Sequence, residues 1–275
     1  MRRLLVGLLI TAASLAAWFT LRAGDTATVL EPDMQNVAYG EHQRQRYDVY
    51  RPNGDGPFPA IVWIHGGGWV GGDKAYLPPA SLLVDQGYVV VAINYRFALD
   101  GATIADSVTD TNAAIEHFLD AADSFDVDAD RVGLYGHSAG GHLAAMAATK
   151  LDVAAVVTTG APTDFASLVD PQRSVFEARA SQDAAAHIQT LLGCAGAGCD
   201  EAVASLSPAR IAPGPAPVLV VHGSDDSIVS VEQATRYIEH LRASGVAVES
   251  DVIDGGDHWS KNQTAIDGFF ARYLG

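Results

Sequence analysis

The 275-residue sequence has little cysteine and few basic residues. Its two cysteines are too few for a disulfide scaffold or for a four-cysteine zinc site. Seventeen lysines and arginines stand against 33 aspartates and glutamates, which gives a formal net charge of −16. Such a surface repels phosphate backbones and argues against nucleic-acid binding. Glycine (27) and proline (12) are also too scarce for a collagen-like or low-complexity chain.

Apolar residues, in contrast, are plentiful. They make up 48% of the sequence, whereas charged residues make up 18%, so a packed core is expected. The length suits one large α/β domain better than two small ones, and no internal repeat is present.

The N-terminus has the pattern of an export signal. Met1-Arg2-Arg3 precede an uncharged apolar run over residues 4–21. The run is longer than the usual hydrophobic segment of a signal peptide and close to the roughly 20 residues that span a bilayer. We therefore expect residues 1–23 to be a cleaved signal peptide or an uncleaved membrane anchor.

Both alternatives predict export, to the periplasm or the extracellular space, with a membrane tether through residues 4–21 in the second case. The polar, aperiodic stretch 24–36 is predicted to be a linker, and residues 37–275 to be the folded domain.

Short apolar runs alternate with helical patterns along this domain. Continuous apolar runs are typical of strands that are buried on both faces. The predicted strands are Tyr47–Tyr50, Ala60–Ile64, Tyr88–Ile93, Arg131–Tyr135, Val153–Thr159, Val218–Val221 and Val246–Ile253. The predicted helices are Pro78–Gln86, Thr103–Ala122, Ala139–Lys150, Val231–Ala243 and Thr264–Tyr273. The alternation predicts an α/β fold with a mostly parallel sheet and helices on both faces.

One long stretch, residues 162–217, interrupts this alternation. It contains a possible helix, Ala178–Leu192, both cysteines and several prolines. We expect it to be a small insertion over the carboxyl ends of the strands, where it shapes a binding cleft.

The segment Gly136-His-Ser138-Ala-Gly140 matches the pattern G-x-S-x-G. It lies between a predicted strand and a predicted helix, which is the setting of a nucleophile elbow. Ser138 would then project at a helix N-terminus, where negative charge is stabilised. The alternative is a serine that only caps this helix.

A second glycine-rich segment, His65-Gly-Gly-Gly68-Trp69, also follows a predicted strand. Three consecutive glycines favour a function that needs bare backbone. The backbone N–H groups of Gly67, Gly68 and Ala139 could hold the oxyanion of an acyl-transfer reaction. His65 is expected to anchor the loop, and a merely flexible turn is the alternative.

A carboxylate and a histidine follow the last two predicted strands. Asp226 lies in His222-Gly-Ser-Asp-Asp226, and His258 ends Gly255-Gly-Asp-His258. The order Ser138, Asp226, His258 is the nucleophile–acid–base order of α/β-hydrolases. Asp225 is the alternative acid.

Two further histidines, His142 and His222, are expected to be structural. Cys194 and Cys199 are separated by glycine and alanine only, so a local disulfide is favoured over two free thiols in an exported protein. No metal site is expected.

Together these motifs resemble the α/β-hydrolase esterases and lipases of the carboxylesterase, hormone-sensitive-lipase-like and feruloyl-esterase-like group. The matching segments are His65–Lys74, Asn94–Arg96, Gly136–His142, Ser207–Pro208, His222–Asp226 and Gly255–His258. The resemblance covers residues 37–275 and implies the α/β-hydrolase fold. It also implies Ser138 as nucleophile, His258 as base and Asp226 as its partner.

The resemblance implies hydrolysis of carboxylic esters without a cofactor. Because the chain has no substantial N-terminal cap, we expect short or medium acyl chains, or acyl groups carried on a polysaccharide. An amidase, formamidase or exopeptidase with the same three residues is the nearest alternative. A non-catalytic binding module with this fold is the alternative of another class. The sequence does not indicate an oligomeric state.

Overall fold

A computed structural model describes residues 30–76, 80–98, 101–169 and 181–275. The predicted signal peptide or anchor and residues 24–29 of the predicted linker therefore lie outside the described residues. Pro32–Gly275 form one compact unit. Within the described ranges, no helix has both the length and the apolar character needed to cross a membrane.

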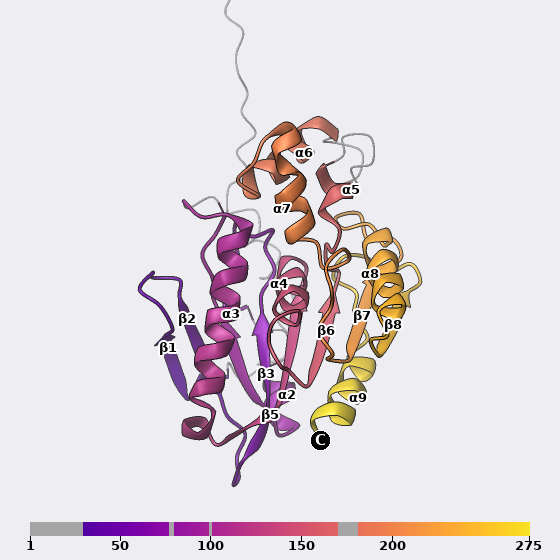
Figure 1. The fold of residues 1–275 in the computed structure, drawn as a ribbon. Helices are drawn as coiled ribbons and strands as arrows, with labels where there is room; N and C mark the ends of the chain where they lie inside the picture. The colour runs from indigo at the N-terminus through magenta and orange to yellow at the C-terminus, as the bar shows by residue number, and fades with distance from the viewer. Residues whose placement is uncertain (1–29, 77–79, 99–100, 170–180) are drawn as a thin grey trace, which may run out of the picture. The chain divides into compact units, whose positions relative to one another are not determined.

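The unit is built on an eight-stranded sheet with the order β1-β2-β4-β3-β5-β6-β7-β8 (Figure 1). The strands are β1 (Met34–Ala38), β2 (Arg46–Tyr50), β3 (Phe58–Ile64), β4 (Val89–Ile93), β5 (Val127–His137), β6 (Ala155–Thr159), β7 (Val218–Gly223) and β8 (Val248–Ile253). β2 is antiparallel to both β1 and β4, and every other pairing is parallel. The prediction of a mostly parallel sheet is confirmed.

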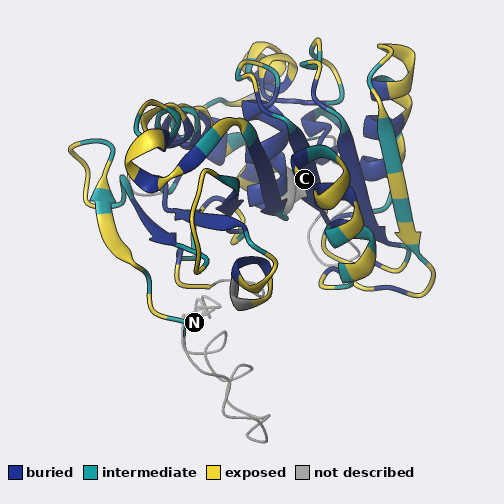
Figure 2. Ribbon diagram, turned by 90° about the horizontal axis from the view of Figure 1, so that it is seen from below, coloured by how far each residue is buried: buried dark blue, intermediate teal, exposed yellow. Residues whose placement is uncertain are grey.

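The central strands are buried on both faces. In β3, Ala60, Val62 and Ile64 join one hydrophobic core. Trp63 points to the opposite face, where its ring lies 4.8 Å from that of Tyr135. Figure 2 shows these central strands in dark blue, whereas the edge strands β1 and β8 are largely exposed or half-buried.

β1 was not predicted. Its first three residues fall in the stretch 24–36 that the sequence assigns to the linker. An exposed edge strand has no continuous apolar run, so the hydrophobic pattern does not reveal it.

Helices cover both faces of the sheet, as predicted. They are α2 (Ala80–Asp85), α3 (Ile104–Asp120), α4 (Ala139–Ala147), α5 (Phe165–Val169), α6 (Ser181–Leu191), α7 (Asp200–Ser205), α8 (Glu232–Ala243) and α9 (Gln263–Leu274), with the 3₁₀ turns η1 (Ala122–Phe125) and η2 (Gly196–Cys199). Ile115 of α3, Leu143 of α4 and Leu241 of α8 share one core. Phe270 of α9 packs on the other face, 6.2 Å from the ring of Tyr135.

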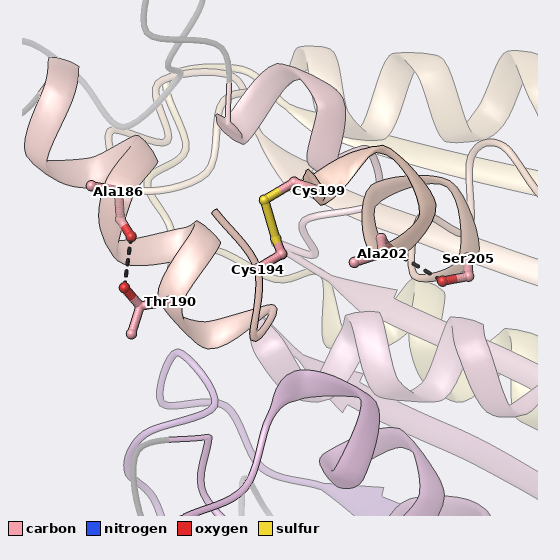
Figure 3. Close-up of a disulfide and its surroundings, with 6 residues drawn as sticks. All are labelled: Ala186, Thr190, Cys194, Cys199, Ala202 and Ser205. Atoms are coloured by element: carbon pink, nitrogen blue, oxygen red, sulfur yellow. Dashed lines mark hydrogen bonds between the residues drawn. A yellow bond between two sulfur atoms is a disulfide. The ribbon is translucent and has the colours of Figure 1, made fainter. Parts of the chain in front are cut away.

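The predicted insertion contains α5, α6, η2 and α7, while residues 170–180 lie outside the described residues. Figure 1 shows α5, α6 and α7 grouped beyond the end of the sheet toward which β3 and β6 point. Cys194 and Cys199 form a disulfide with Cα atoms 5.1 Å apart, between α6 and α7 (Figure 3). The short helices α5 and α7 were not predicted.

Candidate active site

Ser138 occupies a sharp turn between β5 and α4. Its backbone has φ 54° and ψ −124°, which a non-glycine residue rarely adopts. An added Cβ at Gly136 would overlap the carbonyl of Gly140, and one at Gly140 would overlap the carbonyl of Ile64. The turn therefore needs both glycines of the motif. The Ser138 side chain makes no capping hydrogen bond to α4, so the alternative of a simple N-cap serine is wrong.

A continuous hydrogen-bond chain joins the three residues predicted from motif order. His258 Nε2 lies 3.0 Å from Ser138 Oγ. His258 Nδ1 lies 2.7 Å from Asp226 Oδ2. Ser138 is half-buried, whereas His258 and Asp226 are buried. Ser138 and His258 are 120 positions apart in the sequence, and Asp226 and His258 are 32 apart, yet the fold brings all three into contact.

The surroundings of Asp226 favour its ionised form. Its Oδ1 accepts the backbone N–H groups of Ile228 and Val229, both at 2.8 Å. Burial alone raises the pKa of Asp226, but hydrogen bonds from His222, His258 and Val229 outweigh it and hold the pKa well below its ordinary value. The carboxylate is therefore charged at neutral pH and can stabilise an imidazolium at His258.

The alternative acid, Asp225, points elsewhere. It is exposed and accepts a hydrogen bond from Ser224 Oγ at 3.0 Å. His222 contacts Asp226. Its Nε2 lies 2.7 Å from the carbonyl of Val229 and 3.2 Å from Asp226 Oδ2. This placement agrees with a structural role for His222.

The glycine loop, which we define as Gly66–Gly68 after β3, lies against Ser138. A Cβ built on Gly66 would be 3.1 Å from the Cβ of Ser138. Gly67 and Gly68 have φ of 116° and 61°, conformations that glycine adopts readily. Within the described part of the chain, neither residue's backbone N–H has an acceptor. The N–H of Ala139 opens α4, so it too has no acceptor within its helix.

His65 is buried beneath this loop and does not contact Ser138. Its Nδ1 lies 2.7 Å from the carbonyl of Gly66, and its ring stacks on Tyr95 at 4.5 Å. Burial, with the nearby charge of Arg44, lowers the pKa of His65 to about 4. A neutral, buried ring tied to the loop agrees with the predicted anchoring role.

His142 links the site to the insertion. It is buried, and its Nδ1 accepts the indole N–H of Trp69 at 3.2 Å. Its Nε2 lies 2.8 Å from the carbonyl of Leu206, just after α7. Burial lowers the pKa of His142 to about 4, so this histidine is a neutral structural link, as predicted.

Two aromatic residues beside the site had no predicted role. The rings of His137 and Trp259 lie 4.9 Å and 5.3 Å from the ring of His258, and 4.9 Å from each other. Trp259 is 64% exposed, although it touches two buried or half-buried rings. The position of an aromatic residue directly after the candidate base His258 is the sequence signal by which Trp259 could have been found.

Among the described residues, no group of three or more histidine, cysteine, aspartate or glutamate side chains is arranged to hold a metal ion.

A family comparison agrees with this architecture. The model of the BD-FAE family matches residues 47–241, more than two-thirds of the chain, including Ser138 and Asp226. The chain belongs to the BD-FAE family. Among curated relatives of this BD-FAE member, Esterase LipC of Mycobacterium tuberculosis (strain ATCC 25618 / H37Rv) is 31% identical over 222 residues, which cover 76% of this chain and 55% of LipC.

Kynurenine formamidase of Danio rerio is 26% identical over 272 residues, which cover 90% of this chain and 82% of the formamidase. The BD-FAE chain spans about a quarter to about half the length of the first curated relatives that it matches.

The solved structure of a truncated form of carbohydrate esterase from gut microbiota superimposes on this chain with a TM-score of 0.76. It is 20% identical, and the match covers 91% of this chain and 99% of that one. The fold of this BD-FAE member is that of an α/β-hydrolase.

Proposed function

We propose that this chain is a serine hydrolase of carboxylic esters. The observation that carries the proposal is the unbroken hydrogen-bond chain from Ser138 Oγ through His258 to Asp226. A hydroxyl beside a neutral imidazole, itself oriented by a carboxylate, is the arrangement that activates serine as a nucleophile. Membership of the BD-FAE family and the likeness to Esterase LipC support the same activity.

In the first half-reaction, His258 Nε2 takes the proton of Ser138 as Oγ attacks the ester carbonyl carbon. The tetrahedral intermediate collapses when the imidazolium returns that proton to the leaving alcohol, which leaves an acyl-serine. Water then repeats the two steps, so that the acid is released and Ser138 is restored. Asp226 holds the N–H of His258 at Nδ1 throughout and stabilises the imidazolium.

The oxyanion of each intermediate is held by the backbone N–H groups of Gly67, Gly68 and Ala139. Two observations support this assignment. Gly66, the residue before Gly67, packs against Ser138, and Ala139 directly follows it. None of the three N–H groups has an acceptor of its own among the described residues. Loss of one such donor typically costs about 3–4 kcal/mol of barrier, or about 100- to 1000-fold in rate.

Substitution of the three side chains tests the mechanism. We expect Ser138→Ala to abolish ester hydrolysis and Asp226→Asn to lower kcat about 10⁴-fold, because the amide stabilises the wrong tautomer of His258. Asp225→Asn is the matched control, and it should retain kcat within about twofold. Full activity of Ser138→Ala, or equal loss in the two aspartate variants, would contradict the assignment.

The substrate class we propose is short- or medium-chain esters, or acyl groups linked to a polysaccharide. The exposed indole of Trp259 beside His258 offers a flat apolar surface to the alcohol side of such an ester. A chain-length series of p-nitrophenyl esters, with acetylated and feruloylated xylan beside it, separates these substrates.

A second candidate is hydrolysis of an amide or formamide by the same side chains. The likeness to kynurenine formamidase over 90% of the chain favours it. Matched ester, anilide and formamide substrates decide between the two: a kcat/KM higher for the formamide than for every ester would make the formamidase function primary. Absence of turnover on all three would favour a non-catalytic binding module.

We also propose that residues 1–23 direct export, as a cleaved signal or as an anchor. The apolar run 4–21 after two arginines supports this proposal. The mass of the protein recovered from its native compartment distinguishes the two, because cleavage removes the N-terminal segment. Recovery of the full-length protein from the cytoplasm would contradict export.

A further inference from the structure

The glycine loop beside Ser138 is tied down through one histidine, His65. The carbonyl of Gly66 can only accept a hydrogen bond, so the His65 Nδ1 atom at 2.7 Å must carry the hydrogen. The backbone carbonyl of His65 accepts the hydroxyl of Tyr95 at 2.8 Å. The His65 side chain therefore donates a hydrogen bond to the loop only while its ring hydrogen is on Nδ1.

Arg44 faces the other nitrogen of the same ring. Its Nη2 atom lies 3.3 Å from His65 Nε2 and 3.2 Å from the carbonyl of Gly72. A guanidinium group has only donors, so His65 Nε2 must be the acceptor and cannot carry a hydrogen. The two contacts on opposite sides of the ring thus demand the same tautomer.

The Arg44 side chain is itself held rigidly. Its Nε donates to the carbonyl of Tyr95 at 2.8 Å, and its guanidinium carbon lies 3.6 Å above the ring of Phe97. Asp73 adds an ion pair at 3.8 Å. Arg44 comes from the segment between β1 and β2, so a strand connection at one edge of the sheet reaches the loop that follows the central strand β3.

We propose that Arg44 is a positioning residue for the glycine loop: it holds His65 in the Nδ1–H form and so fixes Gly66, Gly67 and Gly68 against Ser138. The effect on catalysis rests on the proposed esterase function, whereas the effect on the His65 tautomer does not.

The loop has little room to absorb a change at His65. A Cβ on Gly72 would overlap both His65 Nδ1 and the carbonyl of Gly66, so these groups are already in close contact. A Cβ on Gly66 would lie 3.1 Å from Ser138 Cβ. A shift of the Gly66 carbonyl is thus passed directly to the N–H groups of Gly67 and Gly68. Oxyanion donors stabilise the transition state only when their N–H groups point at the oxyanion. A displacement of about 1 Å therefore lowers the reaction rate strongly.

The tautomer is read directly by NMR. Long-range ¹H–¹⁵N spectra, with the His65 signals assigned by comparison with His65→Gln, should show hydrogen on Nδ1 alone in the wild-type protein at pH 7. Arg44→Ala should show hydrogen on Nε2 in part of the molecules. An unchanged Nδ1–H pattern in Arg44→Ala would overturn the proposal, whatever the protein hydrolyses.

Kinetics then test the consequence for the reaction. We expect Arg44→Ala to lower kcat about 10- to 100-fold with KM within about threefold, because the loop stabilises the transition state rather than the bound ester. The inhibition constant of a boronic acid that binds Ser138 should rise by the same factor as kcat/KM falls. Added guanidinium should restore part of the lost rate.

Arg46→Ala is the matched control. Arg46, the first residue of β2, directly follows the same connection. It donates to three backbone carbonyls, those of Gly40, His42 and Gln45, none of which belongs to the glycine loop. It should keep kcat within about twofold and show no guanidinium rescue. An equal loss in Arg44→Ala and Arg46→Ala would mean that both merely stabilise the connection, and would overturn the positioning role. If the wild-type protein hydrolyses no ester, the proposed function fails, while the NMR result still decides the role of Arg44.

Discussion

Gly140 is the residue on which the turn at Ser138 depends most directly. A Cβ there would overlap the carbonyl of Ile64, which belongs to the rigid central strand β3. Gly140→Ala should therefore lower the free energy of unfolding by about 1–3 kcal/mol, as measured by urea denaturation, because the strand cannot move away.

Gly268→Ala is its control. Gly268 is exposed on α9, and an added Cβ meets nothing within 4 Å. This substitution should raise the free energy of unfolding by about 0.5–1 kcal/mol, since alanine favours helix. A Gly140→Ala variant as stable as Gly268→Ala would contradict the packing described for the turn.

Trp259 is the residue for which the structure suggests a role in substrate selection. Its indole stands beside His258, the group that would protonate the leaving alcohol. Trp259→Ala should raise KM about tenfold for phenyl butyrate, equivalent to about 1.4 kcal/mol of lost binding, and leave KM for methyl butyrate within about twofold. An equal rise for both esters would show that Trp259 does not contact the alcohol.

Prediction from sequence works best for residues within local motifs. Ser138, Asp226 and His258 each follow a strand, and their order along the chain is informative by itself. Arg44 carries no such signal. Its partner His65 is 21 positions away, and the two meet only because β2 and β3 lie in one sheet. Pairings made by tertiary packing of polar side chains are not visible in a local pattern.

At the scale of elements, burial decides whether a strand can be predicted from the sequence, and β4 and β1 are opposite cases. Every residue of β4 is buried, so its apolar run predicts a strand without ambiguity. β1 pairs at the sheet edge and is mostly exposed, so its sequence resembles a linker. Helices α5 and α7 have only five and six residues, which is too short for a helix that is stable alone. They depend on packing within the insertion, which a local sequence pattern does not reveal.

Asp164 illustrates that packing. It lies just before α5 and forms ion pairs with Arg210, after α7, and with Arg236 of α8. Burial alone raises its pKa, but the hydrogen bonds and charges of the two arginines outweigh it and hold the pKa below its ordinary value. The folded carboxylate thus stays ionised to a lower pH than the unfolded one.

The stability that Asp164 contributes is therefore complete above the ordinary aspartate pKa of about 4 and is lost as pH falls through the lower folded value. Asp164→Asn should lower the free energy of unfolding at pH 7 by about 1–3 kcal/mol and reduce its fall between pH 5 and pH 3. Asp152→Asn, at an exposed position before β6, is the control and should leave the free energy of unfolding at pH 7 unchanged. Unfolding curves of Asp164→Asn and the wild-type protein that keep the same pH slope would contradict this account.

For the whole molecule, the net charge of −16 bears on which esters can approach. Exposed Asp225 and Asp257 lie next in sequence to Asp226 and His258, so two exposed carboxylates stand close to the site. An ester with a carboxylate on its acyl group should show kcat/KM that rises at least about threefold from 10 to 200 mM salt, because screening weakens the repulsion. A neutral ester of the same size should change little, and parallel salt dependence of the two would contradict the prediction.

The central claim is that the hydroxyl of Ser138 is the nucleophile of this fold. Labelling of the intact protein with a fluorophosphonate, followed by mass spectrometry of its peptides, tests it most directly. The account predicts one adduct per chain, on Ser138, and none in Ser138→Ala. Stoichiometric labelling of Ser138→Ala, or an adduct on a different residue of the wild-type protein, would contradict it.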